Sequence, residues 1–142
     1  RLDDLFEAVK RLVTAEWPKD SFTLTLDIHP AGLDIYADRD LLEPVLLNLL
    51  HNAWYATEGT NGAEIHLGGR LNRRGNAVIE VSDNGPGVPE ELTRKIFVPF
   101  FTTRHGGTGV GLALARQVMI AHGGFIRVAT NEHGGARFTL TF

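Results

Sequence analysis

Two asparagines in an apolar stretch, Asn48 and Asn52, have a spacing that could support chemistry. They stand at i and i+4 of a predicted helix, which places both amides on one helical face. Amide oxygens are hard ligands of the kind that Mg²⁺ accepts, and they add no negative charge beside phosphates. The same pair also fits a polar surface patch or a hydrogen bond between packed helices. The spacing alone leaves these three interpretations open.

A single carboxylate, Asp83, follows the alternating stretch 76–82 and begins the sequence Asp-Asn-Gly-Pro-Gly. These residue types are common turn formers, so a surface turn is the simplest interpretation. A carboxylate at a strand end could also accept a hydrogen bond from the exocyclic amino group of adenine, and it would repel the carbonyl oxygen of guanine. Gly85 and Gly87 would then let the base lie against the backbone.

A glycine-rich stretch, Gly106-Gly-Thr-Gly-Val-Gly111, runs directly into an apolar helical pattern that begins at Leu112. Glycines allow close approach of a ligand, and a helix N-terminus offers free N–H groups with a partial positive charge. The strand and βαβ unit of a dinucleotide-binding fingerprint are not predicted here, and the lysine of a P-loop is missing from the stretch. The pattern predicts a phosphate cradle that belongs to neither of these two folds.

The composition sets the class of protein in which these groups act. The chain has 142 residues, of which 43% are hydrophobic and 22% charged, as in one soluble globular domain. It has no cysteine, which excludes disulfides, thiolate metal sites and cysteine nucleophiles. A net charge of -3 argues against a broad nucleic-acid surface. No apolar run approaches the roughly 18 residues of a membrane span, so we expect no direct membrane contact. The sequence opens without methionine and in mid-pattern, so a longer, membrane-anchored parent stays open.

Hydrophobic periodicity predicts the elements that must position these groups. The predicted helices are 2–15, 38–57, 89–96 and 112–122, and the predicted strands are 22–28, 34–37, 63–70, 76–81, 125–129 and 136–142. Asp38 is the expected N-cap of the second helix, and Pro44 predicts a kink or restart near Glu43. Helices and a mostly antiparallel sheet would share one two-layer α/β sandwich.

Four stretches together resemble the N, G1, F and G2 boxes of the catalytic ATP-binding domain of sensor histidine kinases. They are Asn48-Leu-Leu-His-Asn52-Ala, Asp83-Asn-Gly85-Pro-Gly87, Ile96-Phe-Val-Pro-Phe-Phe-Thr-Thr103 and Gly107-Thr-Gly-Val-Gly-Leu112, in that family's order. The similarity runs from about Ala37 to Phe142 and is closest to the nitrogen-regulatory type. It implies a Bergerat-type fold, in which helices cover one face of a mixed sheet and hold ATP and Mg²⁺ beneath a lid.

The resemblance assigns roles to individual residues. Asn52 would be the principal Mg²⁺ ligand, supported by Asn48, and Asp83 would bind the adenine amino group with Thr139 hydrogen-bonding nearby. Arg104 would approach the γ-phosphate. The other implied nucleotide contacts are Tyr55, Gly85, Gly87, Phe101, Thr102, Thr103, Gly107, Thr108, Gly109, Val110, Gly111 and Leu112. Many kinases of the family have a basic residue where Tyr55 stands. Phe97, Phe100 and Phe101 would anchor the lid or move with it, although core packing is at least as good an interpretation of Phe97.

The resemblance also separates kinases from hydrolases. Hydrolytic relatives carry a glutamate one helical turn before the metal-binding asparagine, where this chain has Asn48, and an amide is no general base near neutral pH. His51 has a different helical azimuth from Asn52, so we expect it to be non-catalytic. The alternatives are a superfamily ATP hydrolase or a nucleotide-binding module without kinase activity.

The partners implied by the resemblance lie outside this chain. None of the six histidines has the acidic, helix-borne context of the family's phospho-acceptor. We therefore expect the acceptor on a separate dimerisation domain of a cytoplasmic, homodimeric parent, with residues 1–15 as the tail of the joining helix. A response-regulator receiver domain would act downstream.

Overall fold

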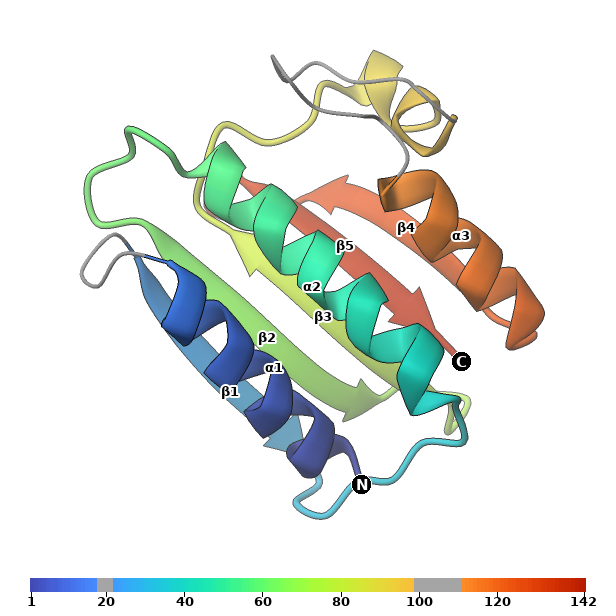
Figure 1. Ribbon diagram of the computed structural model, residues 1–142. Helices are drawn as coiled ribbons and strands as arrows, with labels where there is room; N and C mark the ends of the chain where they lie inside the picture. Colours follow the sequence, from blue (N-terminus) through green and yellow to red (C-terminus); the bar gives the residue numbers. More distant parts are fainter. Residues whose placement is uncertain (18–21, 99–110) are drawn as a thin grey trace.

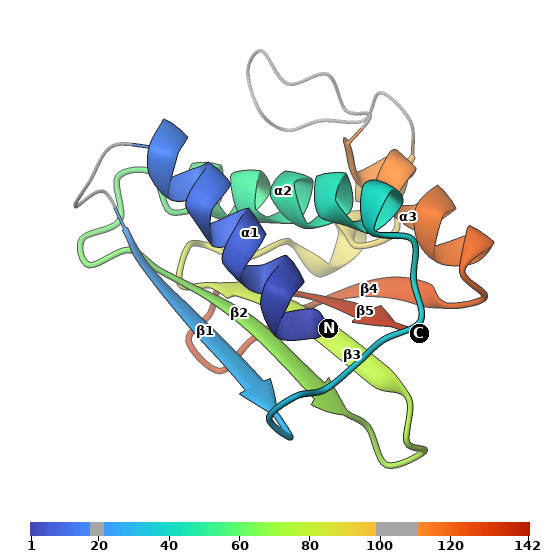
Figure 2. The same ribbon diagram turned by 60° about the horizontal axis from the view of Figure 1, so that its bottom comes forward.

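The computed structural model describes residues 1–17, 22–98 and 111–142, which form a sheet with helices on one of its faces (Figures 1 and 2). The described strands are β1 (Thr23–His29), β2 (Glu64–Leu71), β3 (Ala77–Asp83), β4 (Phe125–Thr130) and β5 (Ala136–Thr141), and the described α-helices are α1 (Leu2–Glu16), α2 (Arg39–Ala56) and α3 (Gly111–Ala121). The strand order is β1-β2-β3-β5-β4. Only the β1–β2 pair is parallel among these strands, which confirms the predicted mixed, mostly antiparallel sandwich.

Helix α1 lies over β1 and β2 and is part of the hydrophobic core (Figure 1). Its buried face carries Leu2, Phe6 and Val9, each with no exposed surface. Gly69 of β2 makes this close packing feasible, because a Cβ at that position would overlap the Leu2 side chain. The N-terminal helix therefore stabilises the sheet directly.

Helix α2 begins as its sequence predicts. The Asp38 side chain caps it by accepting a hydrogen bond from the Asp40 N–H at 2.9 Å. The helix is continuous through Pro44, so the restart that we predicted near Glu43 does not occur. Pro44 lies in the second turn on an exposed side, where the missing N–H deprives only the Asp40 carbonyl of its helical partner. The apolar face of α2 packs into the core through Leu42, Val45, Leu46, Leu49, Leu50 and Ala53.

Two predicted elements differ from the structure. Residues 34–37 form no strand, and Tyr36 is fully exposed, because this segment crosses from the end of β1 to the helical layer. The predicted helix 89–96 is instead two short 3-10 turns, Glu90–Leu92 and Lys95–Phe97. The second turn brings Phe97 edge-on against Phe138 of β5, with ring centroids 6.4 Å apart. Phe97 is thus a core residue, which agrees with the interpretation that it serves core packing.

The opposite face of the sheet carries no helix within the described residues (Figure 2). None of the described helices is long and apolar enough to cross a bilayer.

Candidate nucleotide site

One face of α2 connects two of the predicted motifs. Asn48, Asn52 and Ala56 follow one another at four-residue spacing on this face. The Asn48 amide lies against Gly111, the first residue of α3: a Cβ on Gly111 would stand 3.3 Å from Asn48 Cγ. At the other end, the Ala56 carbonyl is so close to Gly85 that a Cβ there would overlap it. The α2 face therefore joins the start of α3 to the turn that follows β3.

Asp83 is the last residue of β3 and is only 5% exposed. Its Oδ1 accepts hydrogen bonds from the backbone N–H groups of Gly85 at 2.9 Å and Ala136 at 3.3 Å. Burial raises the pKa of the Asp83 carboxyl, and these two hydrogen bonds offset part of the increase. Within the described residues both bonds to the side chain end on Oδ1, so Oδ2 is the oxygen that can meet a ligand.

The Asp83–Gly87 turn is fixed by its neighbours on two sides. The side chain of Asn84 accepts a hydrogen bond from the Glu64 N–H at 2.8 Å and donates one to the Gly62 carbonyl at 2.9 Å. Gly87 has a φ of 79°, and a Cβ there would lie 2.6 Å from the Gly134 carbonyl oxygen. The turn is therefore packed between neighbouring segments, and its acid is buried, which a simple surface turn would not require.

His51 faces away from this arrangement. Its ring stacks on Trp17 at 5.5 Å and on Trp54 at 6.0 Å, against the end of α1. Tyr55 is 39% exposed, and its ring lies 5.3 Å from the His51 ring. The His51 ring is thus part of an aromatic cluster, and its non-catalytic role stays a prediction.

The structure does not bring the Thr139 side chain to Asp83. Thr139 pairs with Glu80, whose side chain lies on the face opposite to Asp83, because β3 alternates between the two. On β5 the neighbours Phe138 and Leu140 point into the core, which directs Thr139 away from it. The backbone N–H of Ala136, which the sequence analysis did not identify, contacts Asp83 instead.

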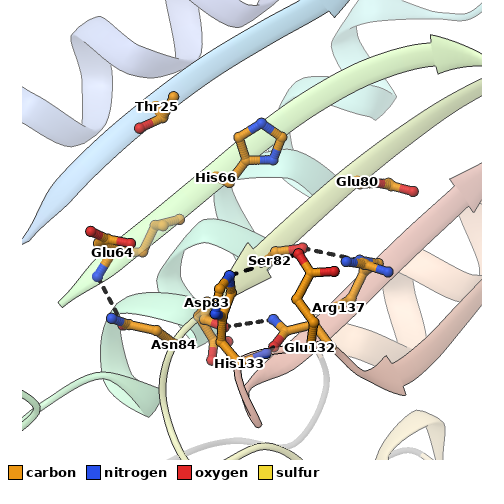
Figure 3. A pocket seen from close by; sticks show the side chains of 12 residues that line it. Thr25, Glu64, His66, Glu80, Ser82, Asp83, Asn84, Glu132, His133 and Arg137 are labelled. Carbon is orange, nitrogen blue, oxygen red and sulfur yellow. Dashed lines mark hydrogen bonds and ion pairs between the residues drawn. The ribbon is translucent and has the colours of Figure 1, made fainter.

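The face on which Thr139 lies has a shallow hollow of about 360 Å³ (Figure 3). It is lined by Thr25, His66, Glu80, Ser82 and Arg137, among others. The Arg137 Nε donates a hydrogen bond to Ser82 Oγ at 3.4 Å. Across the described ranges, no group of three His, Asp or Glu side chains is arranged to hold a metal ion. The lining of this hollow includes Asp83 at one end but no residue of α2, the helix that carries the asparagines.

The structure locates part of the predicted nucleotide-binding set. Gly111 and Leu112 open α3, and Gly85 and Gly87 form the turn after β3. The predicted lid residue Phe100 and the predicted contacts Phe101, Thr102, Thr103, Arg104, Gly107, Thr108, Gly109 and Val110 lie outside the described residues. Their roles stay predictions.

Comparison with known protein families identifies the class of ATP-binding domain to which this chain belongs. Residues 37–142 match the model of the histidine kinase-, DNA gyrase B- and HSP90-like ATPases. The chain belongs to this family. As a member of it, the domain is an ATP-binding catalytic domain, and its relatives place it with the histidine kinases.

Two curated relatives are histidine kinases. The chain is 45% identical to the signal transduction histidine-protein kinase AtoS of Escherichia coli over 106 residues, which are 75% of this chain and 17% of AtoS. It is 40% identical to the sensory histidine kinase/phosphatase NtrB of Klebsiella oxytoca over 143 aligned residues, covering 94% of this chain and 40% of NtrB. The kinase domain thus spans less than half the length of either relative.

Solved structures agree with this assignment. The nucleotide-free catalytic domain of histidine kinase ThkA superposes with a TM-score of 0.87 at 32% identity, covering 99% of this chain and 91% of the ThkA chain. ShkA in complex with AMPPNP gives a TM-score of 0.85 at 26% identity, covering 99% of this chain and 29% of ShkA. ThkA has also been solved with the response regulator protein TrrA.

Proposed function

We propose that this kinase domain binds ATP together with Mg²⁺ and transfers the γ-phosphate to a histidine on a separate dimerisation domain of its parent protein. The observation that carries the proposal is the buried Asp83 carboxylate, held through Oδ1 at the end of β3, beside the α2 face that bears the asparagines. ATP is the substrate that the family implies.

Asp83 supplies the selectivity for adenine in this proposal. Two backbone N–H groups orient its carboxylate, so that Oδ2 would accept a hydrogen bond from the adenine amino group. The carbonyl oxygen of guanine at the equivalent position would face the same oxygen without a hydrogen between them. A buried charge facing an unpaired acceptor is strongly unfavourable, which gives discrimination against GTP.

The residues on α2 fit a magnesium ion bound with nucleotide phosphates. Their amide oxygens are neutral, hard donors, and the Asn48 amide lies against the first residue of α3, where helix N–H groups favour anions. Asn52 would hold the ion and Asn48 would support it. Mg²⁺ bound there would neutralise charge on the phosphates.

Among the described residues, the position one helical turn before Asn52 supplies no base that would activate water. The residue one turn before Asn52 is Asn48, an amide, and His51 is stacked on Trp17. Bound ATP would therefore persist until an external histidine attacks. We infer that this acceptor is carried by a homodimeric, cytoplasmic parent and that a response-regulator receiver domain takes the phosphoryl group, since the relative ThkA was solved with its regulator TrrA.

Calorimetric titration of the domain with ATP and GTP, with and without Mg²⁺, tests the binding part of the proposal. We expect ATP to bind at least about tenfold more tightly than GTP, Asp83→Asn to reduce that preference, and Asn52→Ala to remove the dependence on Mg²⁺. Asn76→Ala, at an exposed asparagine of the β2–β3 hairpin, is the matched control and should bind like wild type. Equal affinities of the wild type for ATP and GTP would refute the adenine assignment.

Turnover of γ-³²P-labelled ATP tests the kinase part. The domain alone should release little phosphate, and label should appear on the parent's dimerisation domain when the two are mixed. Steady release of phosphate by the isolated domain would instead identify a hydrolase.

A further inference from the structure

A buried asparagine in the β4–β5 turn is bonded to the backbone of Asp83. Asn131 is 8% exposed, and its side chain uses its whole hydrogen-bonding capacity. Nδ2 donates to the Asp83 carbonyl at 2.8 Å and, more weakly, to the Ala136 carbonyl at 3.4 Å. Oδ1 accepts from the N–H groups of His133 at 2.9 Å and Gly135 at 3.0 Å. One side chain thus closes its own turn and reaches a strand that is far away in sequence.

The hydrogen bond from Asn131 to the Asp83 carbonyl lies where the hydrogen-bond ladder between β3 and β5 ends. The last paired residues are Ser82 and Arg137, so the Asp83 carbonyl lies just beyond the regular pairing. The Asn131 amide takes the place of the next ladder bond. Gly135 packs against the same carbonyl, because a Cβ on Gly135 would overlap it. Figure 3 shows Asp83 and His133 at one end of the hollow, where the end of β3 meets this turn.

The position of the Asp83 carboxylate therefore depends on this turn at two points. Its backbone carbonyl is held by Asn131, and its Oδ1 is held by the N–H of Ala136, which begins β5. A shift of the turn would move both anchors together. Hydrogen bonds weaken steeply with distance and angle, so a small displacement would misdirect Oδ2.

We propose that Asn131 is a positioning residue for adenine selectivity: its side-chain amide fixes the backbone of Asp83 and so aims the Asp83 carboxylate at the adenine amino group. The inference rests on the proposed ATP-binding function. Asn131 itself would not touch the nucleotide.

Asn131→Asp is the variant that tests this role. The new carboxylate can still accept hydrogen bonds from His133 and Gly135, but it cannot donate to the Asp83 carbonyl. Asn72→Asp is a matched control in the β2–β3 turn, where Asn72 Oδ1 also accepts two backbone N–H groups, those of Arg74 and Asn76, at 2.9 Å each. The control therefore makes the same chemical change in a turn that does not contact Asp83.

We expect Asn131→Asp to raise the Kd for ATP roughly tenfold and to leave the Kd for GTP within about twofold, whereas Asn72→Asp changes neither. In an Asp83→Asn background, Asn131→Asp should cause no further loss of selectivity, since the carboxylate through which it acts is already gone. If circular dichroism shows that Asn131→Asp is unfolded, Asn131→Ser carries the test. A serine hydroxyl can close such a turn but is too short to reach the Asp83 carbonyl.

The outcomes separate this inference from the proposed function. A wild type that binds ATP and GTP equally overturns both. A selective wild type, with variants that keep its ATP/GTP ratio, overturns the role of Asn131 alone. A parallel loss of affinity for both nucleotides also overturns it, because that is the effect of a merely structural residue.

Discussion

At the scale of single residues, Asp83 meets two opposing requirements. It is almost fully buried at the end of β3, which disfavours its charged form, and it must be ionised to accept a hydrogen bond from adenine on Oδ2. The N–H groups of Gly85 and Ala136 stabilise the ionised form only in part. Both ATP binding and folding stability should therefore depend on pH through the raised pKa of Asp83.

Binding of ATP should weaken in mild acid. Because the Asp83 pKa is raised above the ordinary value of about 3.9, the carboxylate is lost at a higher pH than usual as the pH falls. The preference for ATP over GTP should decline over the same range. Titrations at a series of pH values down from neutral measure this, with Asp83→Asn as the control whose affinity ratio stays flat. A wild-type ratio as flat as that of the variant would contradict the prediction.

The raised pKa of Asp83 affects folding stability in the opposite direction to ATP binding as the pH falls. A carboxyl group with a raised folded-state pKa contributes stability that is fully present below the unfolded pKa and is lost as the pH rises through the folded value. Ionised Asp83 thus lowers the free energy of unfolding at neutral pH. We expect Asp83→Asn to be more stable than wild type at pH 7, with the difference shrinking in acid. Urea denaturation of both proteins checks this; a variant less stable than wild type at pH 7 would be inconsistent with it.

At the scale of elements, the site is made where α2, the turn after β3 and the β4–β5 turn pack together. Local patterns predicted much of this: the Asp38 cap and apolar face located α2, and the alternation before Asp83 located the end of β3. They did not predict Asn131, because its partner lies 48 residues away and no local pattern relates the two. Thr139 is a different case, since Phe138 and Leu140 already indicate by alternation which way it points. For Thr139 the family resemblance and the alternation of the strand point to opposite faces of the sheet.

The contact between two turns can be tested with a pair of glycines. Gly87 and Gly75 have nearly the same positive φ, 79° and 82°, but only Gly87 has a close neighbour, the Gly134 carbonyl oxygen, which would stand 2.6 Å from a Cβ on Gly87. Each change to alanine introduces backbone strain of about 1 kcal/mol. We expect Gly87→Ala to lose about 1–3 kcal/mol more than Gly75→Ala from the collision.

Only the first of these two changes should affect the site. Gly87→Ala should also weaken ATP binding, because it pushes apart the Asp83–Gly87 turn and the β4–β5 turn, whereas Gly75→Ala should bind ATP like wild type. Thermal denaturation and ATP titration of both variants make the comparison. Equal losses of stability in the two variants would show that the contact with Gly134 is unimportant.

At the scale of the whole molecule, the helical layer has two parts with different tasks. Helices α2 and α3 carry the asparagines and the end of the glycine-rich stretch, while α1 covers β1 and β2 (Figure 1). The residues that face the proposed nucleotide site come from α2, the turn after β3 and the start of α3. Stability and binding should therefore respond separately to changes in α1.

Phe6→Ala tests that separation. Phe6 has no exposed surface and packs close to Gly69 of β2, so its truncation should lower the free energy of unfolding by about 3–5 kcal/mol. That loss is a large share of the roughly 5–15 kcal/mol free energy of unfolding of a typical native domain. Leu12→Ala, on the same helix at a side chain that is 42% exposed, is the control and should lose less than about 1 kcal/mol.

In conditions where Phe6→Ala stays folded, its Kd for ATP should lie within about twofold of wild type, since Phe6 lies over β2 and not at the α2 face that carries the asparagines. Urea denaturation and ATP titration measure the two quantities; a large loss of ATP affinity in folded Phe6→Ala would mean that α1 and the nucleotide site are energetically coupled.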